Sequence, residues 1–277
     1  RYGNFVGDYS FWEKGWKGFV NGDKKPTSTP DPEVKYDRVL DRAILSCDSH
    51  PDYTDFWPLS VAAWDRIGVK PTLIIIERPG ENIQIDESIG DVIRLELEDE
   101  SIHTAFAAQA VRLLAPCLYP NENVTIADID IMPLNQEYLF KNLCRGPEDS
   151  FIEYRNGCVG SDQVAMCWNA AKGCVWAEIF DIRATIKNYQ KVFGDRLKQW
   201  SPKNYKPISE GWSNEWFTDQ QLLYKYLRDW DGGERHVKLT DSQAGHSRLD
   251  HRIERIPGMH DRYTDFCPRR PARHNLD

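Results

Sequence analysis

Residues 124–135 read VTIADIDIMPLN, an apolar run that ends in two carboxylates, Asp128 and Asp130. The run has the length and character of a buried strand over residues 124–128. Charged groups are costly to bury unless something neutralises them, so the pair needs a cation, a basic partner or a place at the open end of the strand. The rest of the chain helps to choose among these three.

From residue 42 the chain alternates between strand-like and helix-like segments. Strands are expected over residues 42–47 (RAILSC), 72–77 (TLIIIE), 91–97 (DVIRLEL) and 124–128 (VTIAD), with helices over 58–67 and 103–114 between them. A further strand is predicted over 164–170 (VAMCWNA), and helices over 175–192 and 218–229. This alternation predicts an α/β fold with a mostly parallel sheet and helices on both faces.

Ligands of parallel sheets bind outside the carboxyl ends of the strands. Two polar loops are expected there, SCDSHPDYTDFWP (46–58) after the first strand and DIDIMP (128–133) after the fourth. The candidate binding site therefore lies at this edge of the predicted sheet.

The composition excludes several classes of protein. The chain has 277 residues, 40% of them hydrophobic, which allows a sizeable core in one large domain or two small ones. The longest apolar run, residues 71–76, is strand-sized, whereas a spanning helix needs roughly 18 apolar residues, so no transmembrane segment is expected. The net charge of -8 argues against broad nucleic-acid binding, and a ligand phosphate would need a metal or arginines nearby.

Seven cysteines are scattered through the chain without a CxxC pair. They indicate neither a zinc cluster nor a disulfide scaffold and favour a reducing, cytoplasmic compartment. The chain begins at Arg1 without a signal-like segment, and one sequon, at Asn123, keeps a secretory lumen open as an alternative if the N-terminus is truncated.

The first residues differ in composition from the rest. Residues 1–23 carry seven aromatic side chains, and the stretch KKPTSTPDP (24–32) separates them from the remainder of the chain. We expect an aromatic arm and a Pro-rich linker over residues 1–35, and a single domain over residues 36–277. The arm could cover its own domain or a partner subunit, so the sequence leaves the oligomeric state open.

The spacing of Asp128 and Asp130 suits a shared cation. In extended geometry the side chains of residues i and i+2 point the same way, so both carboxylates could reach one ion at the end of the strand. Oxygen ligands suit Mg²⁺ or Mn²⁺, which commonly keep open positions for substrate phosphates. The alternative is plain turn or helix-cap chemistry, which Asp also favours.

Several stretches resemble a known family. TAFAAQAVRLLAPCLYP (104–120) followed by VTIADIDIMPL (124–134) resembles the helix and the Asp-x-Asp strand of GT-A fold nucleotide-sugar glycosyltransferases. SCDSHPDYTDFWPLSVAAWDRIGVKPTLII (46–75) is similar to the first nucleotide-binding loop of those encoded by large DNA viruses of algae and by some microbes. VAMCWNAAKGCVWAEIFDI, WFTDQQLLYKYL and YTDFCPRRP resemble later blocks, so the likeness covers roughly residues 42–270.

The resemblance implies a fold, a cofactor and a donor. It implies a Rossmann-like GT-A domain with a nucleotide-sugar-binding half over residues 36–160 and an acceptor-binding half over residues 161–277. A divalent metal, Mn²⁺ or Mg²⁺, held by Asp128 and Asp130, would bridge the two phosphates of a UDP-sugar. The residues implied for the donor and its metal are Ser46, Cys47, Asp48, Tyr53, Gln109, Arg112, Asp128, Ile129 and Asp130.

The family often supplies a third metal or phosphate contact from a histidine near the end of the chain. Cys267 stands in that place here, and a thiol is a poor ligand for Mg²⁺ or Mn²⁺. His260, Asp265 or an additional water would then complete the site, and His260 is our preferred candidate.

The resemblance also implies acceptor-side residues. For an inverting enzyme Asp219, in WFTDQQ, resembles the carboxylate at a helix start that deprotonates the acceptor hydroxyl, with Thr218 as the helix cap. Glu215 is the alternative base, and a retaining reaction would need none. Candidate acceptor-binding residues are Trp212, Trp216 and Asn169.

The leading hypothesis is therefore a metal-dependent glycosyltransferase, a hexosyl- or pentosyltransferase, that moves a sugar from a UDP-sugar to a glycan hydroxyl. A viral enzyme of this kind would act in the host cytoplasm. A nucleotidyltransferase would need a Gly-rich basic loop after the first strand, and residues 46–56 contain neither glycine nor lysine. A glycoside hydrolase would need carboxylates about 5 to 9.5 Å apart across the scissile bond. A non-catalytic glycan- or nucleotide-binding protein with the same fold stays an alternative.

Overall fold

The computed structural model describes residues 35–207, 210–211, 213–247 and 264–266. The chain divides into two units, Arg1–Lys35 and Tyr36–Asp277, and the second unit carries all the helices and strands that the structure describes. The predicted aromatic arm lies outside the described residues, and the division of the main domain near residue 160 stays a prediction.

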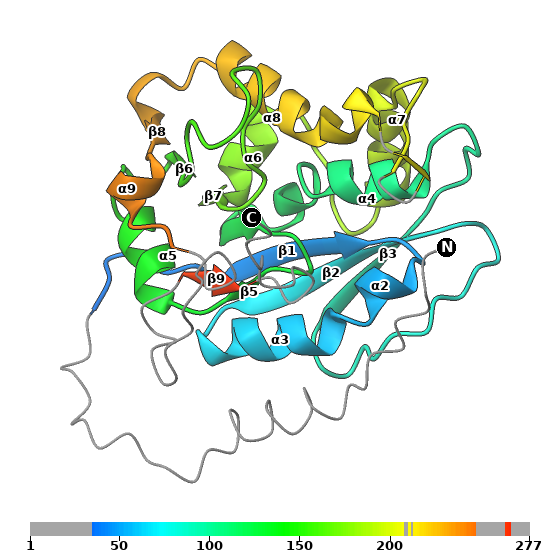
Figure 1. The fold of residues 1–277 in the computed structure, drawn as a ribbon, viewed down its shortest axis with the longest axis horizontal. Coiled ribbons are helices and arrows are strands. Elements are labelled where there is room, and N and C mark those ends of the chain that lie inside the picture. Colours follow the sequence, from blue (N-terminus) through cyan, green and yellow to red (C-terminus); the bar gives the residue numbers. More distant parts are fainter. Residues whose placement is uncertain (1–34, 208–209, 212, 248–263, 267–277) are drawn as a thin grey trace, which may run out of the picture. The chain divides into compact units, whose positions relative to one another are not determined.

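The described residues form a sheet of seven strands in the order β3-β2-β1-β4-β7-β6-β8 (Figure 1). β1, β2, β3 and β4 run parallel, β7 is antiparallel to β4 and β6, and β8 is parallel to β6. The predicted α/β class with a mostly parallel sheet is therefore confirmed. The strands are β1 (Arg42–Cys47), β2 (Lys70–Glu77), β3 (Asp91–Glu96), β4 (Asn123–Ile126), β6 (Phe151–Glu153), β7 (Asn169–Lys172) and β8 (His236–Lys238); β5 (Met132–Pro133) and β9 (Asp265–Phe266) pair separately.

Helices cover both faces of the sheet, as the sequence predicts, with α3 on one face and α4, α6 and α8 on the other (Figure 1). The helices are α2 (Pro51–Thr54), α3 (Trp57–Arg66), α4 (Thr104–Val111), α5 (Gln136–Leu143), α6 (Gly173–Ile179), α7 (Tyr189–Trp200), α8 (Thr218–Asp229) and α9 (Asp241–Ala244). The described residues also form the 3₁₀ turns η1 (Ala115–Leu118), η3 (Asn214–Phe217) and η4 (Gly233–Arg235).

The core has two layers because alternate residues of a strand face opposite sides of the sheet. In β1, Ile44 packs into the layer beneath α4, α6, α7 and α8, whereas Ala43 and Leu45 pack into the layer with α3 and α5. All three side chains are fully buried. β1 is therefore covered on both faces, which explains its continuous apolar sequence.

Two predicted elements differ from the structure. The strand expected over residues 164–170 begins only at Asn169, and residues 164–168 before it form irregular backbone with bends at 166–168. The helix expected over residues 175–192 is two helices, α6 and α7. Asp181, in the left-handed region with φ 43°, follows α6, and aspartate tolerates this conformation better than most residues. The prediction of one continuous helix was wrong.

Within the described part of the chain, no helix combines the length and the apolar character needed to cross a membrane.

Candidate functional site

The order of the strands places a crevice at the carboxyl ends of β1 and β4. β1 pairs with β2 on one side and with β4 on the other, so the connections that leave the two strands diverge here. A cavity of about 750 Å³ opens at this edge. Of the residues predicted from the sequence, those that line it are Ser46, Cys47, Asp48, Tyr53, Gln109, Arg112, Asp128, Ile129, Asp130, Trp216 and Asp219.

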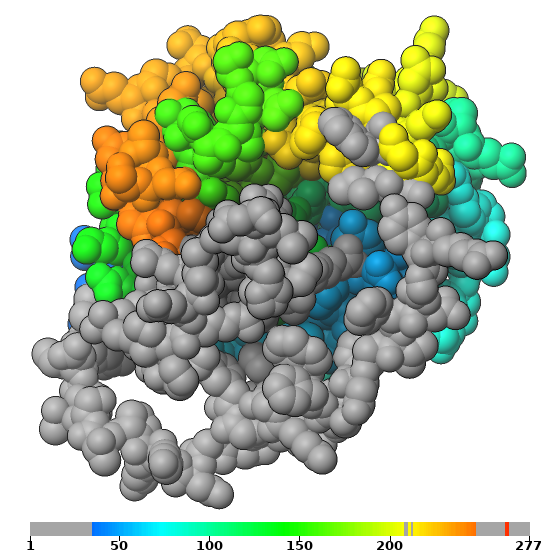
Figure 2. All heavy atoms as spheres, in the orientation of Figure 1, coloured from blue at the N-terminus to red at the C-terminus, as the bar shows by residue number. Residues whose placement is uncertain are grey.

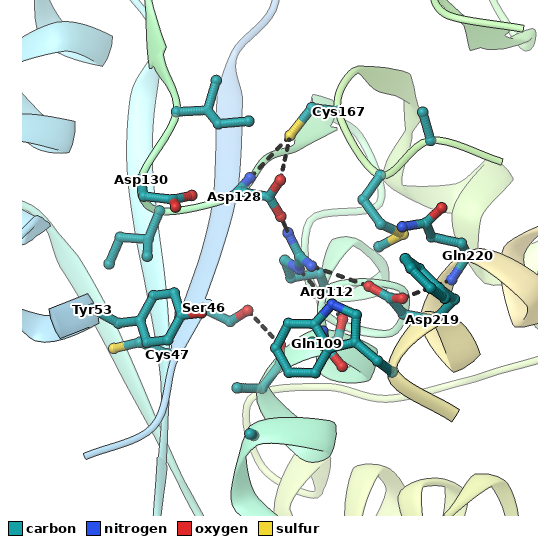
Figure 3. Close-up of a pocket in the computed structure, with 18 of the residues that line it drawn as sticks. Ser46, Cys47, Tyr53, Gln109, Arg112, Asp128, Asp130, Cys167, Asp219 and Gln220 are labelled. Atoms are coloured by element: carbon teal, nitrogen blue, oxygen red, sulfur yellow. Dashed lines mark hydrogen bonds and ion pairs between the residues drawn. The ribbon is translucent and has the colours of Figure 1, made fainter. Parts of the chain in front are cut away.

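Asp128 and Asp130 lie in a turn beyond the end of β4. The strand ends at Ile126, and the backbone N–H of Ile131 donates to the carbonyl of Asp128 at 3.1 Å. The extended geometry assumed for the pair was therefore wrong, since turn chemistry shapes this segment. Both carboxylates nevertheless lie at the cavity (Figure 3).

Arg112 joins two carboxylates. It caps the end of α4 and is 4% exposed. One terminal nitrogen, Nη1, donates to Asp128 Oδ1, and the other, Nη2, donates to Asp219 Oδ2 at 3.2 Å (Figure 3). In this structure a basic partner thus offsets much of the charge of Asp128, which is one of the three possibilities that the sequence left open.

Cys167 holds the other oxygen of Asp128. Its thiol donates to Asp128 Oδ2 at 3.3 Å, and the backbone N–H of Asp128 donates to the sulfur at 3.1 Å. Burial raises the pKa of this thiol well above its usual value, and the negative charge of Asp128 adds to the effect. Cys167 therefore stays protonated and keeps its donor.

Asp219 is buried at the start of α8. It is 2% exposed, and its Oδ1 accepts a hydrogen bond from the N–H of Gln220 at 2.8 Å. Burial raises the pKa of Asp219 to about 6, with Arg112 opposing the rise and Asp128 adding to it. The predicted cap is not Thr218, which is the first helical residue and donates instead to the carbonyl of Glu215.

Glu215, the alternative base, is in a different environment. It does not line the cavity, and a hydrogen bond with Ser213 lowers its pKa. Proton transfer is favoured when the pKa of the carboxylate lies close to neutral pH and the group borders the cavity. A carboxylate that lies outside the cavity and has a lowered pKa is less suited to this role. The geometry therefore favours Asp219 over Glu215.

The end of β1 and the loop after it use their polar side chains within the protein. The hydroxyl of Ser46 donates to the carbonyl of Ala108. Asp48 accepts from Thr104 Oγ1 at 2.9 Å and from the N–H of His50 at 3.2 Å. The bonds to Ala108 and Thr104 join the end of β1 and the loop after it to α4.

The aromatic residues of the site come from both sides of the cavity. Tyr53 packs edge-on against His50, with ring centroids 5.8 Å apart. On the other side, Trp216 stacks on Tyr205 at 6.0 Å, and the hydroxyl of Tyr205 donates to Gln109 Oε1 at 2.8 Å. Both Tyr53 and Trp216 line the cavity and offer a face to a ring-shaped ligand.

Some predicted residues are not brought to the site. Asn169 is completely buried, and its amide donates to the carbonyls of Ala165 and Met166, so its predicted acceptor-binding role is corrected to a structural one. Trp212 and His260 lie outside the described residues.

The cavity also contains side chains that sequence reasoning missed. Arg155 stands in the loop after β6, where nothing in the local pattern marks it, and its guanidinium pairs with Asp241 at 3.0 Å. Cys167 falls within a block that carries the resemblance but was not assigned a role. Further lining residues missed from the sequence are Cys158, Met166, Phe217 and Gln220.

The formal charge of the lining is negative. Four carboxylates border the cavity, Asp48, Asp128, Asp130 and Asp219, against two guanidinium groups, Arg112 and Arg155. An anionic ligand would therefore need additional positive charge to bind here. Asp128 and Asp130 supply oxygen donors of the kind that Mg²⁺ and Mn²⁺ prefer, although the described residues contain no group of three or more acidic, histidine or cysteine side chains arranged around one ion.

No protein-family model matches the sequence, and no curated protein matches it. Solved structures that are similar to the chain include two of the glycosyltransferase GlyE from Streptococcus pneumoniae TIGR4, the second in its apo form. Each is 14% identical and covers 74% of this chain, with TM-scores of 0.40 and 0.41. This chain spans about half of the length of those structures, 46% of each.

Proposed function

We propose that this protein is a metal-dependent glycosyltransferase of the GT-A type, which transfers a sugar from a UDP-sugar to a hydroxyl group of a glycan. One observation carries the proposal: Asp128 and Asp130 share a cavity with the buried Asp219, whose pKa is raised to about 6. The resemblance of residues 42–270 to that family supports it independently of the geometry.

A metal is proposed because of the charge of the cavity. A diphosphate in this cavity would lie near an excess of carboxylates. A divalent cation held by Asp128 and Asp130 would offset the negative charge of the carboxylates and of the diphosphate. When bound, Mn²⁺ or Mg²⁺ would stabilise the charge on the departing nucleoside diphosphate. Asp265 is a poor third ligand because it is buried, accepts from Trp168 Nε1 at 3.0 Å and does not line the cavity. His260 or water is left for that position.

Asp219 is proposed as the base of an inverting reaction. The acceptor oxygen forms a bond to the anomeric carbon while the bond from that carbon to the diphosphate oxygen breaks, and the hydroxyl proton passes to Asp219. With a pKa of about 6, Asp219 is mostly ionised at pH 7 and able to accept the proton. Arg112 Nη2 holds the carboxylate in place, and a carboxylate has lone pairs left for a further donor.

One rival has an observation in its favour. Both oxygens of Asp128 already accept hydrogen bonds, from Arg112 and Cys167, so the protein balances this carboxylate without a metal. That arrangement also suits a glycan- or nucleotide-binding protein that has no catalytic turnover. Metal-dependent release of the nucleotide separates the two functions.

The test is to incubate the protein with Mn²⁺ and a panel of UDP-sugars and to measure the release of UDP, with and without EDTA. The proposal predicts release from at least one donor, lost with EDTA and reduced by at least about 100-fold in Asp128→Ala. Asp195→Ala, on the exposed surface of α7, is the matched control and should retain full activity.

Two results would count against the proposal. Nucleotide-sugar binding without release of UDP under any condition would favour the non-catalytic alternative. Full activity in Asp128→Ala would remove the proposed role of the metal.

A further inference from the structure

A second cavity of about 270 Å³ lies near the first. It is bordered by β6, β8, α8 and the loop after β6, through residues such as Glu153, Ser161, Tyr224 and Lys238. In Figure 2 this loop, in bright green, stands at the surface between the orange segment that carries β8 and α9 and the yellow segment that leads into α8. The proposed reaction gives this cavity no role.

The register of β6 and β8 explains the position of the cavity. Phe151 pairs with His236, and Glu153 pairs with Lys238, so these four side chains share one face of the sheet. Phe151 packs against Trp176 in the core, with ring centroids 5.0 Å apart. Two residues further along, the core ends, and the same face presents a carboxylate at the carboxyl end of β6.

Glu153 is unusual for a buried acid. Its side chain is 4% exposed, and its nearest partner is Nε2 of His236, 3.3 Å from Oε2. Among the described residues, Oε1 accepts no hydrogen bond. Glu153 lines the cavity, so a ligand that brings hydroxyl groups there can donate to this oxygen.

The charges around Glu153 limit the class of ligand. An anion would face the buried carboxylate, and a cation would face Lys238 and Arg228 at the rim. A neutral molecule with many hydroxyl groups avoids both penalties. Ser161 and Gln163 can donate and accept hydrogen bonds, and the ring of Tyr224 offers an apolar surface, a combination that suits a sugar.

Helix α8 connects the two cavities. Asp219 and Gln220 line the first, and Tyr224 lines the second. Gln220 and Tyr224 are four residues apart, which is about 6 Å along a helix axis. Val159 borders both cavities, so the two cavities adjoin at the loop after β6. The two cavities therefore adjoin closely enough for one glycan chain to reach both.

We propose that the second cavity binds a neutral sugar unit of the acceptor glycan, next to the unit whose hydroxyl group is glycosylated. Glu153 accepts hydrogen bonds from hydroxyl groups of that unit, and Tyr224 packs against its ring. The assignment rests on the proposed function for the role of the first cavity, whereas the existence of a sugar site rests on the second cavity alone.

The experiment measures binding of the full chain to an array of neutral mono-, di- and trisaccharides of glucose, galactose, mannose, xylose and fucose, with Mn²⁺ and UDP and again with EDTA. Glu153→Gln removes the charge and keeps the size, and Ser161→Trp fills the cavity from an exposed loop position without changing Glu153. Glu100→Gln, at an exposed position outside both cavities, is the control. Melting temperatures check that each variant folds.

The proposal expects wild type and Glu100→Gln to bind a di- or trisaccharide about tenfold more tightly than either cavity variant. Both variants should release UDP from the donor at the wild-type rate when no acceptor is present. A raised KM for the longer acceptor, with this rate unchanged, would place the defect in the second cavity.

Equal glycan binding by wild type, Glu153→Gln and Ser161→Trp would overturn the sugar site, and so would the absence of binding to any glycan of the array. Failure of the proposed function has a different signature, since no UDP would then be released from any donor. A third outcome is that the protein releases no UDP but still binds a glycan in a way that depends on Glu153. This outcome would support the sugar site and overturn its role in binding the acceptor.

Discussion

At the scale of single residues, the site depends on one guanidinium placed between two carboxylates. Arg112 carries one positive charge, whereas Asp128 and Asp219 together carry two negative charges. Asp128 is partly exposed, so solvent screens its charge, but Asp219 is 2% exposed. Burial is therefore the main reason that the pKa of Asp219 is raised; Arg112 lowers this pKa, and the charge of Asp128 raises it further.

Asp219→Asn should separate activity from stability. Loss of the base is expected to lower the transfer rate by about 100- to 10,000-fold. Acceptor-dependent transfer measured against Asp229→Asn, at the exposed end of the same helix, checks this. A variant that retains the wild-type rate would exclude Asp219 as the base.

The raised pKa of Asp219 also makes the stability of the folded protein depend on pH, and the sign of the pKa shift gives the direction. The pKa of Asp219 rises from 3.8 to about 6 on folding, so the stability contributed by its bound proton is present below pH 3.8 and lost as the pH rises through 6. The shift of about two units corresponds to about 3 kcal/mol. The free energy of unfolding of the wild type should therefore lose up to about 3 kcal/mol of this contribution between pH 4 and pH 7. Asp219→Asn does not titrate there, so its free energy of unfolding should rise relative to that of the wild type by the same amount. Urea denaturation at both pH values measures this gain, and a constant difference would contradict the shift.

Arg112→Met tests whether a metal can replace a buried cation. Removing one partner of a buried ion pair costs about 3 to 5 kcal/mol, since the carboxylates lose their counter-charge. The loss of unfolding free energy should be full in EDTA and smaller in Mn²⁺, because an ion at Asp128 restores positive charge. Arg183→Met, at an exposed position, should cost little in either buffer. An equal loss with and without Mn²⁺ would argue against an ion at Asp128.

At the scale of elements, α8 matters because successive turns of this one helix line the two cavities. Its first turn presents Asp219 to the first cavity, and Tyr224 presents its side chain to the second. Leu223 and Leu227 anchor the helix in the core, so both sets of polar residues are held on one rigid support.

The start of α6 is a second element with tight geometry. A Cβ atom at Gly173 would lie 2.2 Å from the carbonyl oxygen of Tyr119 and 2.5 Å from that of Pro116. Gly173→Ala should destabilise the protein by about 3 kcal/mol, because backbone atoms of η1 and the residue after it would have to move. Gly194→Ala, in α7, meets no atom within 4 Å and should stabilise it by about 0.5 to 1 kcal/mol. Equal melting temperatures for the two variants would contradict this account.

At the scale of the whole described domain, the order of the strands decides where ligands can bind. β1 and β4 lie side by side, and β6 runs in the same direction as both, so their carboxyl ends meet at one edge. Each of these strands has a carboxylate at this edge: Asp48 follows β1, Asp128 lies beyond β4, and Glu153 is the last residue of β6. The two cavities are consequences of this single topology.

Ligand binding at this edge should be visible in the stability of the protein. A ligand at 100 times its Kd that binds only the folded state adds about 2.7 kcal/mol. UDP with Mn²⁺ should raise the melting temperature, whereas UDP with EDTA should not, because the carboxylates of the cavity oppose the diphosphate. Asp128→Ala should abolish the increase. A rise of the same size in EDTA would show that the nucleotide binds without a metal.

Sequence patterns predicted the elements that local periodicity determines. The strand over residues 42–47 and the helix over residues 218–229 agree with β1 and α8 to the residue. The apolar residues around Asp181 predicted one continuous helix, but the left-handed backbone of Asp181 follows the end of α6. A hydrophobic pattern carries no signal for a single left-handed residue. Residues 164–168 have the composition of a strand but form irregular backbone, with bends at residues 166–168, because tertiary context overrides β-propensity.

By itself, the sequence determined the α/β class and placed Asp128 near the end of a strand, since both depend on the order of residues along the chain. Only the tertiary structure decided what neutralises that carboxylate. Arg112 lies 16 residues from Asp128 and 107 from Asp219, and Cys167 lies 39 from Asp128, so no local pattern could pair them. The physical reason is that backbone geometry is set by near neighbours, whereas burial and charge balance depend on groups that only folding brings within a few ångströms.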